Sequence, residues 1–247
     1  MKNTLIACFL LFSLFMFSQN KIIFPKSGTI VFIKEERFLD KNSYLKSYKE
    51  LMPKIKQAMT KELFLERLTN GKSTDKVKLK IEVDKMAENF EMMLPYVIEE
   101  DKKEIRYFNE FNRDTITKYN DEFNNVEIIN QVSGIVVNEF NEHIENIENE
   151  IVKLTEFVNE TKIINGYNCF KVIYNYNEPQ VSDFDFISSV VTNTRELWVT
   201  KEIKCNYHPV INESEILKKY YPLEIKEYSK EIMGFETIYK LEMITIK

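Results

Sequence analysis

The two histidines are the side chains best suited to metal binding or general acid–base chemistry. His143 lies in an acidic stretch with Glu142, Glu145 and Glu148, which together offer the nitrogen and oxygen ligands that divalent cations use. His208 precedes a proline, and this order is typical of a surface turn. A histidine metal site would need both rings together, whereas the acidic stretch alone is typical of a solvated charged face. We therefore expect no metal site.

Catalytic motifs are missing from the chain. It contains no nucleophile elbow, no zinc-binding His-Glu-x-x-His, no phosphate-binding loop and no dinucleotide-binding glycine turn. Only five glycines occur, which leaves little material for a loop that cradles phosphate. The 39 Asp and Glu residues leave a carboxylate-dependent hydrolase open as an alternative, although abundance alone carries no geometry. We expect a non-enzymatic protein with no catalytic residues and no cofactor.

The cysteines offer redox chemistry. Cys8 lies in an N-terminal apolar segment, which leaves Cys169 and Cys205 for the folded part of the chain. Residues 170–176 and 196–203 are both expected strands, and an antiparallel register in which residue 170 faces residue 204 places the two cysteines close together. In an oxidising compartment we expect a disulfide between Cys169 and Cys205, with two free buried thiols as the alternative.

The N-terminus has the pattern of an export signal. Lys2 precedes an almost continuous apolar run from Leu5 to Phe17, and the chain turns polar at Ser18. The run is shorter than the roughly 20 apolar residues that span a bilayer. We expect residues 1 to about 19 to be a cleaved signal peptide and residues 20–247 to form a single domain outside the cytoplasm, in the periplasm, at the cell envelope or secreted. An uncleaved anchor is the alternative; no later segment is apolar enough to span a membrane.

The composition predicts an ordinary core and argues against nucleic acid. Hydrophobic residues make up 44% of the chain and aromatic residues 13%, enough for a packed interior rich in half-buried strands. The net charge of −5 is mildly acidic, whereas nucleic-acid binding needs a clustered basic face.

Two helices are predicted in the first hundred residues. Apolar side chains recur at three- and four-residue spacing over about 41–70, and again over about 80–99. Residues 76–80 fit either a helix or a strand. The methionines Met86, Met92 and Met93 lie in the second helix and could line an apolar cavity between helices and sheet, because methionine adapts to varied apolar shapes. The alternative is that the same residues form ordinary core.

The remainder of the chain is predicted to be mostly strand. Asn165-Gly166, the strongest two-residue turn signal, separates strands over 157–164 and 167–176. A final hairpin is expected from strands over 223–228 and 235–246, a short helix over 212–219, and conflicting signals remain over 137–154. These elements predict an α+β fold: a curved, mostly antiparallel, half-barrel-like β-sheet with the two helices packed on one face.

The C-terminal part resembles a known family of exported proteins. Residues 160–169 (ETKIINGYNC) and 196–203 (ELWVTKEI) resemble two stretches of the GLPGLI family of Bacteroidota, and residues 221–225 (YPLEI) stand where the name-giving motif is expected. The order of elements is also similar to that of LolA-type lipoprotein carriers, whose curved antiparallel sheet cradles acyl chains beneath helices. The GLPGLI resemblance implies an exported protein without established catalytic residues.

The sequence therefore predicts an exported cell-envelope protein that binds an apolar ligand or a partner protein. The first alternative is a LolA-like lipid or lipoprotein carrier, and the second is an extracytoplasmic hydrolase that uses carboxylates. A third is an interaction module whose exposed sheet edge pairs with another chain.

Overall fold

The computed structural model describes residues 22–97, 105–122, 125–139, 149–178 and 191–247. The predicted signal peptide, residues 1–19, lies outside these residues. So do His143 and its acidic neighbours Glu142, Glu145 and Glu148.

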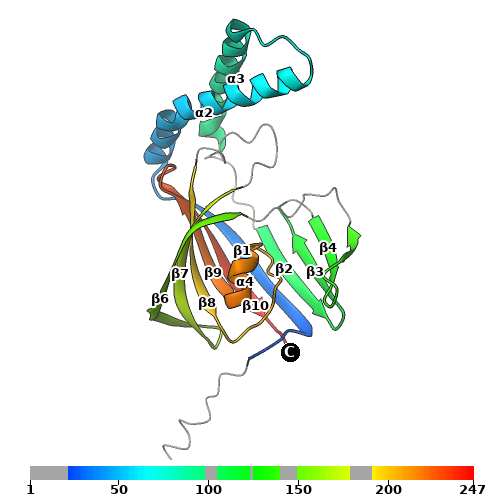
Figure 1. The fold of residues 1–247 in the computed structure, drawn as a ribbon. Coiled ribbons are helices and arrows are strands. Elements are labelled where there is room, and N and C mark those ends of the chain that lie inside the picture. Colours follow the sequence, from blue (N-terminus) through cyan, green and yellow to red (C-terminus); the bar gives the residue numbers. More distant parts are fainter. Residues whose placement is uncertain (1–21, 98–104, 123–124, 140–148, 179–190) are drawn as a thin grey trace, which may run out of the picture.

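A single ten-stranded sheet forms the body of the molecule (Figure 1). The strand order is β5-β4-β3-β2-β1-β10-β9-β8-β7-β6, and every pairing is antiparallel. The first and last strands therefore lie side by side at the centre of the sheet. The strands are β1 (Ser27–Phe38), β2 (Ile105–Asn112), β3 (Thr115–Asn120), β4 (Asn125–Asn130), β5 (Val136–Glu139), β6 (Glu150–Ile164), β7 (Tyr167–Asn177), β8 (Asn193–Thr200), β9 (Tyr221–Ser229) and β10 (Phe235–Ile244).

The predicted α+β class is confirmed, with an open, curved, antiparallel sheet and two long helices. The hairpin of β6 and β7 turns at Asn165 and Gly166, both with positive φ (46° and 86°), as a two-residue hairpin turn of this kind requires. The hairpin of β9 and β10 is confirmed as well. Within the ambiguous stretch 137–154, the described residues belong to strands β5 and β6.

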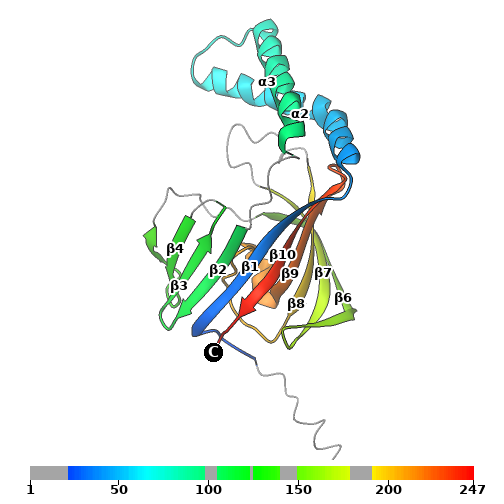
Figure 2. The same ribbon diagram turned by 180° about the vertical axis from the view of Figure 1, so that it is seen from behind.

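The long helices α2 (Lys41–Thr69) and α3 (Lys76–Val97) match the predicted segments, and residues 76–80 prove helical. Their position differs from the prediction. They stand beyond one end of the sheet, where β1 ends and β10 begins, instead of covering one of its faces (Figures 1 and 2). Each helix buries its apolar stripe against the other, and the resulting second core meets the sheet through Phe38 and Phe235.

A short helix covers the concave face of the sheet instead. Helix α4 (Ser214–Lys219) lies in this concavity in Figure 1. Its Ile216 and Leu217 pack into the main core together with Phe32 of β1 and Leu197 of β8, all at most 3% exposed. The concave face is therefore filled by the chain itself, which leaves no room there for α2 and α3.

None of the described helices combines the length and apolar character needed to cross a membrane.

Candidate ligand-binding site

A buried ionic cluster forms where α4 meets the sheet. Arg195 of β8 lies between Tyr174 of β7 and Glu227 of β9 in the strand register. Its guanidinium donates to Glu227 Oε2 (2.6 Å), to Glu213 Oε1 (2.6 Å) and to the Tyr174 hydroxyl (3.1 Å). The cation also lies 4.5 Å from the centre of the Tyr176 ring.

This cluster fastens α4 to the sheet. Glu213 immediately precedes α4, and its carboxylate is 1% exposed. Burial raises the pKa of Tyr174 and Tyr176, so both rings stay neutral in the interior. Glu213 Oε2 and the Tyr176 hydroxyl have no hydrogen-bond partner among the described residues. Removing Arg195 would leave a buried, unpaired carboxylate, a change that typically costs about 3–5 kcal/mol.

His208 belongs to the same covering segment. The sequence predicted a surface histidine, and this prediction was wrong: the side chain is fully buried between the rings of Phe32 and Tyr221. Its Nδ1 accepts from the backbone N–H groups of Val210 and Ile211 (3.0 Å each), and its Nε2 lies 3.1 Å from the Pro222 carbonyl. These contacts fit a neutral ring with its proton on Nε2, and burial lowers the pKa of His208 to about 3.

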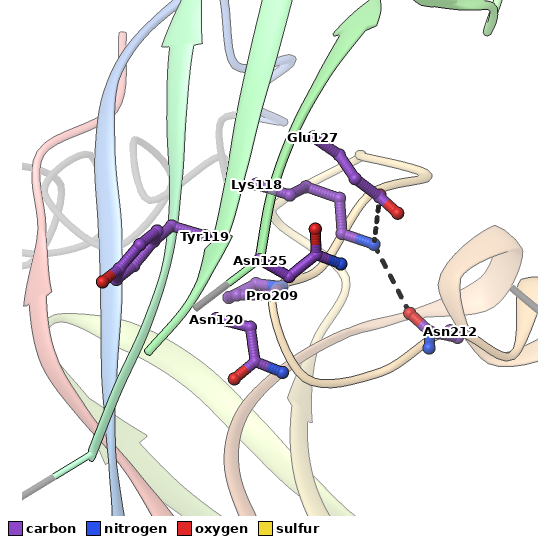
Figure 3. Close-up of a pocket in the computed structure, with 7 residues that line it drawn as sticks. All are labelled: Lys118, Tyr119, Asn120, Asn125, Glu127, Pro209 and Asn212. Carbon is purple, nitrogen blue, oxygen red and sulfur yellow. Dashed lines mark hydrogen bonds and ion pairs between the residues drawn. The ribbon is translucent and has the colours of Figure 1, made fainter. Parts of the chain in front are cut away.

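A small polar pocket of about 80 Å³ lies between β3, β4 and the chain before α4 (Figure 3). Lys118 Nζ donates to Asn212 Oδ1 (3.4 Å) and lies 3.9 Å from Glu127 Oε2. Burial lowers the pKa of Lys118, with the neighbouring Glu127 acting against that shift. The polar lining and small volume suit water or a small ion better than an apolar ligand.

A larger pocket opens beside the other side of α4, and we call it the α4 pocket. Its volume is about 480 Å³, within the usual range for small-molecule sites. Ile22 and Phe24, 53% and 65% exposed, contribute most of its apolar surface, whereas Ile116 of β3 and Leu217 of α4 also line it but are core residues at most 3% exposed. Lys204 and Lys218 also line the pocket. Neither has an ion-pair partner among the described residues, although Lys204 Nζ donates to the Lys219 carbonyl oxygen (3.2 Å). The α4 pocket therefore joins apolar walls to two cationic groups.

The predicted ligand-lining methionines do not line any of the four pockets described for the chain. Met86 packs against the core of the helices, whereas Met92 and Met93 are 62% and 63% exposed. Met92 and Met93 point to solvent, because α3 packs on α2 rather than on the sheet.

Cys169 and Cys205 are both free cysteines. In the sheet, Phe170 faces Val199 rather than residue 204, because β8 ends at Thr200 and the chain then leaves the sheet. Cys169 pairs with Lys162 of β6, whereas Cys205 lines the α4 pocket. Burial raises the pKa of both thiols to about 11. The expected disulfide gains no support from this arrangement and stays a prediction, which a thiol count on the unreduced, denatured chain would test.

Comparisons with known proteins give little guidance. No known family and no curated protein matches the sequence. One similar solved structure is the lipoprotein LppX of Mycobacterium tuberculosis, with 8% identity and a TM-score of 0.27 over 59% of this chain and 79% of that chain. Another is a domain described as an outer membrane lipoprotein-sorting protein from Vibrio parahaemolyticus, with 13% identity and a TM-score of 0.16 over 58% of this chain and 65% of that chain. Likeness this low carries no argument about function.

Proposed function

We propose that the protein is an exported, non-enzymatic binding protein whose ligand is an apolar molecule with an anionic end. The observation that carries this proposal is the α4 pocket, where the exposed apolar side chains of Ile22 and Phe24 adjoin the ammonium groups of Lys204 and Lys218. Apolar surface in a preformed pocket favours a hydrocarbon chain, and two ammonium groups without an acidic partner among the described residues favour a carboxylate or phosphate at its end.

The N-terminal sequence supports the proposal that the protein is exported. Residues 1–19 have the charged start and short apolar stretch of a signal peptide, so the mature chain begins about three residues before Ile23. Ile23 joins Ile203 in a short parallel bridge, and Phe24 follows it into the α4 pocket. The start of the mature chain thereby becomes part of the proposed site.

The alternative of a carboxylate-dependent hydrolase has less support. Four pockets are considered among the described residues. The small polar pocket around Lys118 is lined by Glu127, and a shallow pocket on the sheet beside Val31 is lined by Glu242. No carboxylate lines the α4 pocket or the pocket between α2 and α3. A hydrolase of this class needs two convergent carboxyl groups, so the described pockets favour binding over hydrolysis.

The test is binding of a fluorescent long-chain fatty acid to the mature chain, residues 20–247. We expect saturable binding, and we expect Asn206→Trp to weaken it at least about tenfold, because Asn206 is an exposed residue of the pocket wall and an indole there would fill the space. Asn89→Trp is the matched control, since Asn89 is exposed on α3 and lies away from the pocket.

The charged end of the ligand is tested separately. Lys204→Gln with Lys218→Gln should weaken binding of the fatty acid and leave binding of the corresponding fatty alcohol nearly unchanged. Absence of saturable binding in the unmodified chain, or equal binding by Asn206→Trp and Asn89→Trp, would overturn the proposed function.

A further inference from the structure

The far end of the helical hairpin exposes a group of apolar side chains. Figures 1 and 2 show the turn between α2 and α3 as the part of the described chain most distant from the sheet. Around it, several large apolar residues of both helices are between 37% and 68% exposed; they are Phe64, Leu65, Leu68, Val77 and Ile81. We call these five residues the hairpin tip. Helical spacing of three and four residues places each helix's members on neighbouring turns of that helix.

The charge of the hairpin is opposite to that of the rest of the molecule. Residues 41–97 contain 12 Lys and Arg against 8 Asp and Glu, a net charge of +4. Because the whole chain carries −5, the remaining residues carry −9. Among the described residues, Lys61, Lys76 and Lys78 near the tip have no ion-pair partner. The hairpin is therefore the positively charged part of the molecule, and its far end also exposes apolar side chains.

An apolar groove runs between the two helices at the same end. Its volume is about 470 Å³, and Phe64 and Leu65 of α2 face Leu79 of α3 across it. Lys61 and Lys76 lie at its edge, one from each helix. A phospholipid with an acyl chain in this groove would place the phosphate of its headgroup beside these two ammonium groups.

We propose that the hairpin tip docks on an anionic lipid surface. Exposed aromatic and aliphatic side chains insert into the boundary between headgroups and acyl chains, and the unpaired lysines contact the lipid phosphates. A lipid surface fits these features better than a partner protein, because the tip protrudes from the molecule and carries an excess of positive charge, with six Lys and Arg against four Asp and Glu over residues 61–82. The surface lies apart from the α4 pocket, so this inference goes beyond the proposed function.

The test is co-sedimentation of the mature chain with phosphatidylcholine vesicles, with and without phosphatidylglycerol. We expect binding to the anionic vesicles that weakens as salt is added, and little binding to phosphatidylcholine alone. Lys61→Gln with Lys76→Gln should reduce the partition coefficient at least about tenfold. Leu68→Ser with Val77→Ser should reduce it as strongly, because these two side chains are exposed and their loss leaves the core intact.

The matched control replaces two equally exposed apolar residues of the sheet, Val158→Ser with Ile163→Ser, and should bind vesicles like the unmodified chain. Asn206→Trp should also bind vesicles normally, which separates this inference from the fate of the α4 pocket. No preference for anionic vesicles would overturn the proposal. So would binding that the sheet variant loses as strongly as the tip variants, since the contact would then not lie at the hairpin tip.

Discussion

A single buried imidazole holds the segment that covers the concave face. The backbone N–H groups of Val210 and Ile211 need an acceptor, and the Pro222 carbonyl needs a donor; the neutral ring of His208 meets all three needs. Protonation would place a hydrogen on Nδ1, which then could no longer accept from the two N–H groups. The cost of that change adds to the cost of a charge in the interior.

The pH dependence of stability should report this ring. In the folded chain the pKa of His208 is about 3, against an ordinary value of 6.5, so only the unfolded chain takes up this proton as the pH falls below 6.5. We expect this contribution to lower the free energy of unfolding by about 1.4 kcal/mol per pH unit from pH 6.5 toward pH 3. Urea unfolding at several pH values measures it, with His208→Gln as the comparison.

The His208→Gln variant should be less stable at neutral pH, because its amide does not reproduce all three contacts of the ring. Its stability should nevertheless fall less steeply with acid, since the group that titrates has been removed. Parallel pH profiles for the two proteins would show that His208 contributes nothing to the acid sensitivity.

Residue identity alone did not reveal the buried ionic cluster. Arg195 occupies an inward position of its strand, alternating with Leu197 and Val199, and that alternation was a usable sign of a buried charge. Its partner Glu213 lies 18 positions further along the chain in an irregular segment. No local pattern relates the two, because only the return of the chain across the concave face brings them together.

Local turn chemistry made the hairpins the most predictable elements. Asn165 and Gly166 demand a left-handed turn whatever surrounds them, so the β6–β7 pairing followed from two residues. The register of β7 against β8 depends on where β8 ends, and Thr200 ends it three residues earlier than expected. Helical periodicity correctly indicated that α2 and α3 bury one side each, but it does not specify which surface covers that side.

Gly234 joins the hairpin of β9 and β10 to the start of α2. Its φ is 79°, and a Cβ at this position would lie 2.2 Å from the backbone oxygen of Asp40, the N-cap residue of α2. Gly71 has a similar φ of 64° but no neighbouring atom within 4 Å. Substitutions at the two glycines therefore separate two costs. Gly71 reports the cost of the left-handed backbone conformation alone, and Gly234 adds the cost of the close contact with Asp40.

We expect Gly71→Ala to destabilise the protein by about 1 kcal/mol, the cost of a left-handed conformation for a residue with a side chain. Gly234→Ala should cost about 1–3 kcal/mol more, because the strand end and the helix start must move apart. Urea unfolding measures both. Equal losses would mean that the contact with Asp40 relaxes freely.

At the scale of the whole molecule, the described residues form two separate cores. One lies between the concave face and α4, and the other lies between α2 and α3. They meet at a narrow junction near Phe38 and Phe235, both only partly buried. A connection this narrow permits the core between α2 and α3 to unfold locally while the sheet stays folded. Because the hairpin carries the proposed lipid-binding tip, this independence would let it adjust to a surface without disturbing the α4 pocket.

Native-state hydrogen exchange tests that independence. Ile55 of α2 is 2% exposed in the helical core, and Ile55→Ala should weaken that core by about 2–5 kcal/mol. We expect it to accelerate exchange of the α2 and α3 amides and to leave those of β8, β9 and β10 nearly unchanged. The matched variant Leu197→Ala, at a fully buried position of β8, should accelerate exchange in the sheet. If Ile55→Ala accelerates the sheet amides as much as the helical ones, the two cores unfold as one unit, and the hairpin cannot adjust on its own.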